Sequence, residues 1–188
     1  MSLENIVNNI TSDKNTAHSY LPLYDKLLEG KKDTAKNVLE IGVYYGGSIK
    51  LWHDYFANAT IYGIDIDNGN MIKEELIKNN DRIKLCLLTD GYDDNFVTTE
   101  FLNKDIKFDF MLDDGPHTLE SMIQFIKLYS QLITNDGILI IEDVQSWEWI
   151  ETLKNAVPEY LKQFIKIYDL RPNKKRYDDI VFTIDKSN

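Results

Sequence analysis

Residues 38–48, VLEIGVYYGGS, decide the fold of this chain. The first four form a largely apolar run of the kind found in buried strands. The glycines at positions 42, 46 and 47 allow a tight turn and let a ligand approach the backbone closely. Residues 48–56 then gather their large apolar side chains on one side, which predicts an amphipathic helix. A strand, a glycine loop and a helix in this order are typical of a parallel α/β sheet.

The rest of the chain repeats this alternation of apolar runs and helical patterns. Residues 118–133 form the clearest further helix, with Thr118 as its N-cap, and residues 135–137 (NDG) predict a turn into the next strand. The pattern predicts an α/β fold with a Rossmann-like, doubly wound, mostly parallel seven-stranded sheet and helices on both faces. The last two strands are expected to pair antiparallel at one edge. The strands expected after the first are residues 60–64, 83–88, 108–112, 138–141, 164–169 and 180–184.

Length and composition predict a single domain over residues 1–188, with a helical segment at 1–35 as a candidate lid and a Rossmann-like core at 36–188. The net charge of −10 argues against nucleic acid and anionic membranes as partners. The single cysteine excludes an internal disulfide and a Cys-rich zinc site. Without a signal-peptide pattern or a long apolar run, the expected location is cytoplasmic. The sequence leaves a homo-oligomer open.

Two acidic residues follow the second and third expected strands. Asp65 comes directly after the run that ends at residue 64, where a carboxylate can accept hydrogen bonds from both hydroxyls of a ribose. Asp90 follows the next strand, where an acid could accept a hydrogen bond from an adenine amino group. The competing interpretations are a solvated or helix-capping acid at Asp65 and an ordinary Asp-Gly turn at Asp90.

The order Glu-x-Gly-x-x-x-Gly-Gly, then an acid after each of the next two strands, resembles the class I S-adenosylmethionine-dependent methyltransferases. The resemblance covers roughly residues 38–184. It implies that the glycine loop carries the methionine part of S-adenosylmethionine, that the second-strand acid binds the ribose, and that the third-strand acid lies by the adenine. The cofactor-binding residues implied are Glu40, Gly42, Gly46, Gly47, Ser48, Asp65 and Asp90.

Four carboxylates are expected at the ends of the fourth and fifth strands. The segments are residues 108–117 (FDFMLDDGPH) and 137–145 (GILIIEDVQ), and adjacent parallel strands end at the same edge of a sheet. Two unit charges about 4 Å apart repel by about 4 kcal/mol at an effective dielectric constant of about 20. A hard divalent cation such as Mg²⁺ would relieve this repulsion. The alternative is that some of these acids, Asp113, Asp114, Glu142 and Asp143, face solvent or cap helices.

His117 lies three residues beyond Asp114, past a Gly-Pro corner. Its ordinary pKa near neutrality suits a general base. A metal ligand and the start of the next helix remain alternatives for this residue.

The motifs Asp-Asp-Gly-x-His and Ile-Glu-Asp narrow the resemblance to metal-dependent O-methyltransferases of the mycinamicin and macrocin type, with cephalosporin hydroxylase-like relatives. The resemblance implies that Asp114, Glu142 and Asp143 bind the metal and that His117 is the base, while Asp113 orients His117 or contacts the metal indirectly. It further implies a small-molecule acceptor: a sugar, a nucleotide sugar or a glycoside. The chain lacks the longer N-terminal region and the insertions that shape the acceptor pocket of the macrolide enzymes.

Three other functions compete with methyl transfer. A metal-dependent oxygenase on the same fold would usually need two histidines and one carboxylate, and only one histidine lies near the acids. A non-catalytic S-adenosylmethionine-binding protein is the second, and a nicotinamide oxidoreductase, disfavoured by the glycine spacing, is the third. The basic stretch 169–177 is either a solvated hairpin or a contact to the phosphates of a nucleotide-linked sugar. Trp147 and Trp149 suit sugar contacts or core packing.

Overall fold

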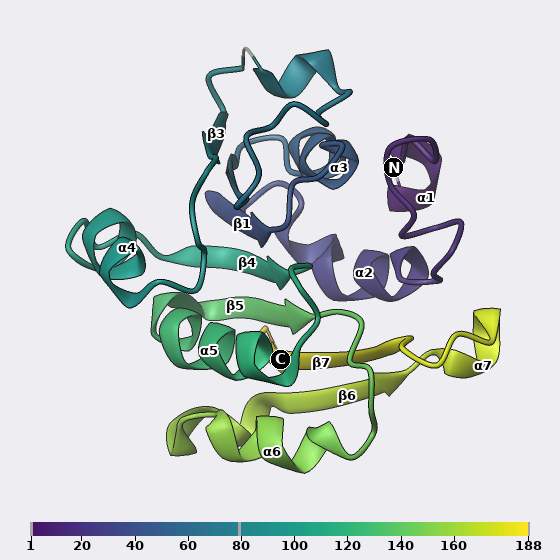
Figure 1. Ribbon diagram of the computed structural model, residues 1–188, viewed down its shortest axis with the longest axis vertical. Helices are drawn as coiled ribbons and strands as arrows, with labels where there is room; N and C mark the ends of the chain where they lie inside the picture. The colour runs from purple at the N-terminus through teal and green to yellow at the C-terminus, as the bar shows by residue number, and fades with distance from the viewer. Residues whose placement is uncertain (1, 79, 188) are drawn as a thin grey trace. The chain divides into compact units, whose positions relative to one another are not determined.

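The computed structural model describes residues 2–78 and 80–187. The chain forms two compact units, an N-terminal unit (Met1–Thr89) and a C-terminal unit (Asp90–Asn188), and each is described by itself (Figure 1). This division does not test the predicted single domain.

Within residues 2–78 and 80–89, the N-terminal unit contains three parallel strands in the order β3-β2-β1. Each of the three was expected from its apolar run. β3 is shorter than predicted because Leu88 adopts a left-handed φ of 53°, which turns the chain after Cys86. The elements are α1 (Leu3–Ile6), α2 (Leu21–Leu28), η1 (Glu29–Lys31), β1 (Asn37–Ile41), α3 (Gly47–Tyr55), β2 (Thr60–Ile64), η2 (Glu75–Lys78) and β3 (Ile83–Cys86).

The first 35 residues pack as part of the N-terminal unit. Helix α1 contacts both α2 and α3, and the side chain of Leu3 is completely buried. The backbone amide of Leu3 donates to both carboxylate oxygens of Asp25, at 2.9 and 3.0 Å. The segment contains the short helices α1 and α2, and its role as a lid stays a prediction.

The part of the C-terminal unit that the structure describes, residues 90–187, contains four strands in the order β4-β5-β7-β6. Strands β4 and β5 are parallel, whereas β7 pairs antiparallel with both β5 and β6, which confirms the predicted antiparallel edge. The elements are α4 (Asp94–Val97), η3 (Thr98–Leu102), β4 (Phe108–Asp113), α5 (Leu119–Tyr129), η4 (Ser130–Leu132), β5 (Ile133–Ile141), α6 (Trp149–Ala156), η5 (Glu159–Phe164), β6 (Ile165–Asp169), α7 (Arg171–Lys174) and β7 (Ile180–Asp185).

Strand β5 differs from the prediction at its beginning. It starts at Ile133, and the expected turn at residues 135–137 lies inside it as an irregularity. Phe108 pairs with Ile133 while Phe110 already pairs with Ile138, so the extra residues of β5 loop away from β4. The turn-forming residues 135–137 therefore produce a bulge within β5 and not a turn that precedes the strand.

Helix α5 begins where the sequence indicated. The Thr118 hydroxyl accepts a hydrogen bond from the backbone amide of Ser121, and the Ser121 hydroxyl contacts the Thr118 amide in return, which completes a capping box. The helix ends at Tyr129, earlier than predicted, because the chain tightens into the 3-10 turn η4. Across residues 2–78 and 80–187, every helix is too short or too polar to span a bilayer.

Candidate functional site

The glycine loop after β1 has three left-handed residues in its turn. Gly42 (φ 97°) and Gly46 (φ 83°) adopt this conformation without steric cost, whereas Tyr44 (φ 45°) adopts it against the ordinary preference of a side-chain-bearing residue. The Gly46 amide donates to the carbonyl oxygen of Val43 at 2.7 Å, and α3 begins directly afterwards. The loop therefore leads from a buried strand into a helix N-terminus, as the sequence predicted.

Asp65 braces the glycine loop. Its Oδ2 accepts hydrogen bonds from the backbone amides of Val43 at 2.7 Å and Tyr44 at 3.0 Å. Its Oδ1 accepts from the amide of Asp67 at 2.8 Å and keeps a lone pair for one further donor. The structure thus brings Asp65 to the loop, and its contact with a ribose stays a prediction.

Two glycines of the loop are also required by packing within the protein. A Cβ atom at Gly47 would overlap the carbonyl oxygen of Thr11, and a Cβ atom at Gly46 would overlap the side chain of Ile77. The glycine pattern therefore has a structural cause in addition to the ligand approach inferred from the sequence.

We expect Gly47→Ala to lower the free energy of unfolding by about 1–3 kcal/mol, because backbone atoms of Thr11 and Ser12 must move. Gly30→Ala is the matched control, since no atom lies within 4 Å of a Cβ atom there, and its effect should stay within about 0.5 kcal/mol. Urea unfolding of both variants measures the difference. Equal stability of the two variants would contradict the close approach of residues 11–12.

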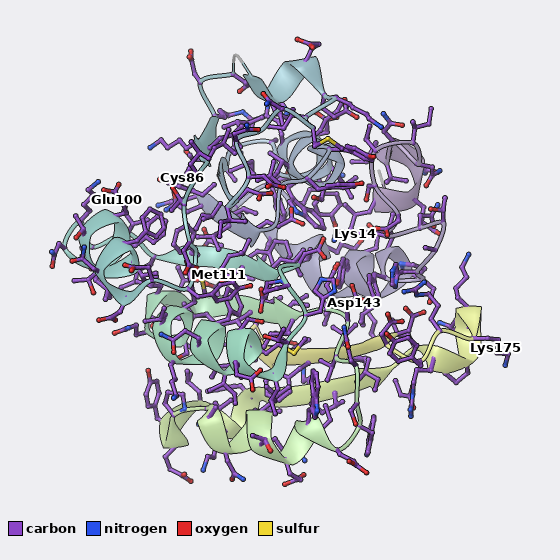
Figure 2. The ribbon with its side chains drawn as sticks, in the orientation of Figure 1. Lys14, Cys86, Glu100, Met111, Asp143 and Lys175 are labelled. Carbon is purple, nitrogen blue, oxygen red and sulfur yellow. The ribbon has the colours of Figure 1, made fainter. Side chains whose placement is uncertain are left out.

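Glu40 is enclosed by protein groups. Its side chain is completely buried, the Trp52 indole donates to its Oε2 at 2.7 Å, and the buried Lys14 ammonium lies 3.6 Å from its Oε1 (Lys14 is labelled in Figure 2). Any contribution of Glu40 to cofactor binding would therefore be indirect, through the position in which it holds β1. Ser48 is likewise buried in the first turn of α3.

Asp90 forms the turn that its Asp-Gly sequence indicated. Its Oδ1 accepts a hydrogen bond from the Tyr92 amide at 2.9 Å, and its side chain is exposed. This geometry leaves the carboxylate accessible, and the predicted adenine contact is untested.

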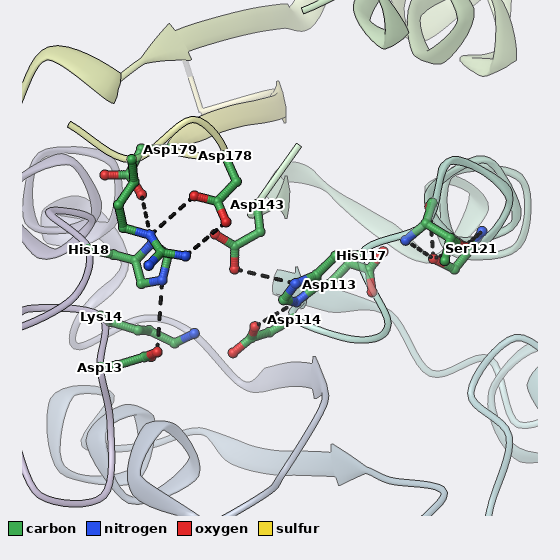
Figure 3. A network of polar contacts seen from close by, with 12 residues as sticks. Asp13, Lys14, His18, Asp113, Asp114, His117, Ser121, Asp143, Asp178 and Asp179 are labelled. Carbon is green, nitrogen blue, oxygen red and sulfur yellow. Dashed lines mark hydrogen bonds and ion pairs between the residues drawn. The ribbon is translucent and has the colours of Figure 1, made fainter. Parts of the chain in front are cut away.

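Asp114, His117 and Asp143 form a cluster at the ends of β4 and β5 (Figure 3). One ligand atom from each lies within 4.8 Å of the others. Nε2 of His117 is 3.3 Å from Oδ1 of Asp114, and Nδ1 is 3.6 Å from Oδ2 of Asp143. Both ring nitrogens thus face carboxylates, an arrangement that suits an imidazolium or a cation in its place.

Two members of this cluster have strained backbones. His117 has a φ of 54° and Asp143 a φ of 51°, in the left-handed region that most side chains avoid. Such conformations concentrate at functional sites, where the surrounding structure holds them. The Gly-Pro corner after Asp114 turns the chain so that the imidazole returns toward the strand ends.

The carboxylates around His117 alter its pKa. Burial alone lowers the pKa of His117, but the hydrogen bond to Asp114 and the charges of Asp114, Asp143 and Asp113 outweigh it and raise the pKa above its ordinary value. His117 is therefore an easily protonated group that shares its site with potential metal ligands.

Asp113 is bonded to a residue that the sequence analysis missed. The Tyr92 hydroxyl donates a short hydrogen bond to Oδ1 of Asp113. Burial raises the pKa of Asp113 to about 7, although the bond from Tyr92 and the charge of His117 lower it. The hydroxyl also occupies the space that a Cβ atom at Gly115 would fill. Above about pH 7, where Asp113 is ionised, its charge acts on His117, while Tyr92 fixes its position.

We expect Tyr92→Phe to destabilise the protein, and more so at high pH. The pKa of Asp113 is raised, so the folded state binds more protons than the unfolded state between about pH 4 and pH 7, and stability falls as the pH rises through this range. Without the Tyr92 hydroxyl, the ionised Asp113 loses its donor, at a cost of about 1–3 kcal/mol. Urea unfolding in EDTA at about pH 5 and pH 8 measures this. Tyr177→Phe, at an exposed position, is the control; equal losses in both variants would refute the role of Tyr92.

Glu142 is completely buried directly after β5, and its backbone amide donates to the carbonyl oxygen of Asp113 at 3.2 Å. Among the described residues, the groups of ligand atoms that lie close enough for a metal do not include its carboxylate. The structure therefore gathers two of the three predicted ligands, Asp114 and Asp143, together with His117. Glu142 as a ligand stays a prediction.

Comparison with known proteins shows that the chain is similar to O-methyltransferases. No family model matches it. It is 24% identical over 147 residues to the demethylmacrocin O-methyltransferase of Streptomyces fradiae. The aligned region covers 74% of this chain and 35% of that protein. It is 28% identical over 144 residues to the mycinamicin VI 2''-O-methyltransferase of Micromonospora griseorubida. This aligned region covers 70% of this chain and 33% of that protein. The chain thus spans about a third of the length of these relatives.

The fold matches a solved structure over almost the whole chain. The MycE methyltransferase of the mycinamycin biosynthetic pathway, in complex with Mg and SAH, superposes with a TM-score of 0.74 and 21% identity, over 98% of this chain and 54% of that one. The Rossmann-like, mostly parallel methyltransferase fold is therefore confirmed. The resemblance to the macrocin and mycinamicin type is confirmed as well, because the chain's curated relatives are sugar O-methyltransferases.

Proposed function

We propose that this chain transfers a methyl group from S-adenosylmethionine to a hydroxyl of a sugar or a glycosylated small molecule, with the help of a divalent cation such as Mg²⁺. The observation that carries the proposal is the cluster of Asp114, His117 and Asp143 at the ends of neighbouring strands. The sugar O-methyltransferases among its relatives support the kind of acceptor.

The residues of the cluster fit a hard cation. Asp114 and Asp143 supply carboxylate oxygens, the ligands that Mg²⁺ prefers, and about a quarter of the Asp114 side chain is exposed, which leaves access for an acceptor. His117 lies in the same cluster and is assigned as the base, not as a ligand. When bound, S-adenosylmethionine supplies an electrophilic methyl group, and the cation supplies a Lewis acid that lowers the pKa of a hydroxyl.

The protein's own groups then hold the reactants and move the proton. The glycine loop and the amides at the start of α3 bind the methionine part of the cofactor, while Asp65 holds the loop in shape. The His117 imidazole accepts the proton of the acceptor hydroxyl, and Asp143 and Asp114 orient the ring and stabilise its charged form. Asp113 adds a negative charge beside His117.

A metal-dependent oxygenase fits the cluster less well. Its usual ligand set is two histidines and one carboxylate, and this cluster has the opposite ratio. A non-catalytic S-adenosylmethionine-binding protein would show binding without turnover.

The proposal is tested by incubating the chain with S-adenosylmethionine, Mg²⁺ and a panel of glycosides and nucleotide sugars. Formation of S-adenosylhomocysteine together with a methylated product supports it. Cofactor binding without product formation on any member of the panel, or product formation that is unchanged in excess EDTA, contradicts it.

A further inference from the structure

A hollow with cationic side chains lies in the C-terminal unit, between the end of β6 and the start of β7. Its volume is about 450 Å³, and Lys175 at its edge is labelled in Figure 2. The hollow is lined by Asp169, Arg171, Pro172, Lys175, Arg176 and Tyr177. Three cations and one carboxylate line it, and both arginines are paired with carboxylates, Arg171 with Asp169 and Arg176 with Asp178.

The guanidinium of Arg171 is held in a fixed position. Its Nε and Nη2 donate to the two carboxylate oxygens of Asp169, at 2.8 and 2.7 Å. The same guanidinium lies 5.5 Å from the ring centre of Trp147, which is half exposed. A guanidinium fixed in this way still has donors directed elsewhere and loses little entropy when it binds an anion.

Arg176 connects the hollow to the candidate metal cluster. It donates to both carboxylate oxygens of Asp178, at 3.1 and 2.8 Å, and lies 3.8 Å from Asp179. A carboxylate oxygen of Asp178 lies within 4.8 Å of one of Asp143. A ligand in the hollow would therefore lie close to the residues that we propose to act on the acceptor.

Lys175 is the cation of the hollow with the most unusual backbone. It follows α7 with a φ of 63°, a conformation that costs a lysine free energy and that glycine adopts freely. Among the described residues, it forms no salt bridge within 4 Å. Many helices end in this left-handed conformation, and the side chain of Lys175 is exposed, so its ammonium is accessible to an anion in the hollow.

We propose that this hollow binds the diphosphate of a nucleotide-linked sugar, so that the sugar to be methylated is presented as a nucleoside diphosphate conjugate. The inference rests on the proposed function and names its acceptor class. Arg171, Lys175 and Arg176 bind the phosphate oxygens, as charge-assisted hydrogen bonds favour. The exposed ring of Tyr177 offers a surface for the base or the sugar.

Calorimetric titration of the chain with UDP, in EDTA and at two salt concentrations, tests the hollow directly. We expect UDP to bind more tightly than inorganic pyrophosphate and more weakly at high salt. Lys175→Gly and Arg171→Gln should each weaken UDP binding by about tenfold or more. Lys104→Gln removes an equal charge from an exposed pair with Glu100 and should leave binding unchanged.

Lys175→Gly also separates a ligand role from a structural one. It relieves the backbone strain, so the thermal unfolding temperature should be equal to or above that of the wild type while UDP binding is lost. UDP binding that is unchanged in Lys175→Gly, absent in the wild type, or no tighter than that of pyrophosphate overturns the proposal.

The outcomes separate this inference from the proposed function. Methyl transfer to an uncharged glycoside that is unaffected by Lys175→Gly would overturn the nucleotide-linked acceptor and leave the methyltransferase intact. UDP binding that depends on Lys175, with no cofactor binding at the glycine loop, would support the hollow and contradict the proposed function.

Discussion

Replacing His117 by alanine is expected to lower turnover by about 100-fold or more, while S-adenosylmethionine binds as it does to the wild type. The reason is that the imidazole is the only group of the cluster whose ordinary pKa suits proton transfer near neutrality. The cofactor-binding residues of the glycine loop are not changed by this substitution. Steady-state kinetics with saturating cofactor, together with calorimetric titration of S-adenosylhomocysteine, measure the two effects separately.

Two further variants serve as controls, one for the left-handed backbone at residue 117 and one for the general effect of losing a histidine. His117→Asn keeps a residue that tolerates a left-handed φ, so it should lose as much turnover as His117→Ala without additional destabilisation. His53→Gln removes an imidazole of α3 that lies 2.9 Å from Asp54 of the same helix and 2.7 Å from Arg82, which precedes β3. Turnover should change little. Turnover near the wild-type value in both His117 variants would exclude His117 as the base.

Removal of the cation, or of one of its proposed ligands, is expected to have the second large effect. Excess EDTA and the substitution Asp143→Asn should each reduce turnover by about 100-fold or more, because the acceptor hydroxyl then keeps its ordinary pKa and loses its fixed position. Added Mg²⁺ should restore activity to the wild type and not to Asp143→Asn. Asp136→Asn, an exposed acid of the β5 bulge, is the matched control.

The same cation should stabilise the fold in a pH-dependent way. The pKa of His117 is raised, so the stability that its protonated form contributes is present below its unfolded-state pKa and is lost as the pH rises through the folded-state pKa. The raised pKa of Asp113 acts in the same direction. The metal-free protein should therefore be less stable at about pH 8 than at about pH 6, and the increase in unfolding temperature with Mg²⁺ should be larger at the higher pH. An increase that is independent of pH would contradict competition between the proton and the cation.

Continuous apolar runs made the strands predictable. Buried parallel strands need apolar side chains on both faces, and residues 138–141 satisfy this without interruption. The irregular start of β5 was not predictable, because residues 135–137 have the composition of a turn while their neighbours still pair with β4. Helix α6 was missed because it is short and has only Ile150 and Leu153 as buried residues.

In the candidate site, the residues that could be predicted are those that directly follow strands. Asp114 and Asp143 were identified because acids directly after parallel strands lie at one edge of the sheet. Tyr92 was not identified, because no local pattern connects it with Asp113, 21 residues away. The enclosure of Glu40 by Lys14 and Trp52 depends on the packing of the N-terminal segment, which no motif describes.

The most direct test of the account is a titration of the EDTA-stripped protein with Mn²⁺, a substitute for Mg²⁺ with similar ligand preferences, followed by electron paramagnetic resonance of the free ion. The account predicts a single saturable ion per chain in the wild type, and loss of this binding in Asp143→Asn and Asp114→Asn but not in Asp136→Asn. Saturable binding that is the same in all four proteins, or no binding to the wild type, would contradict a cation held at the ends of β4 and β5.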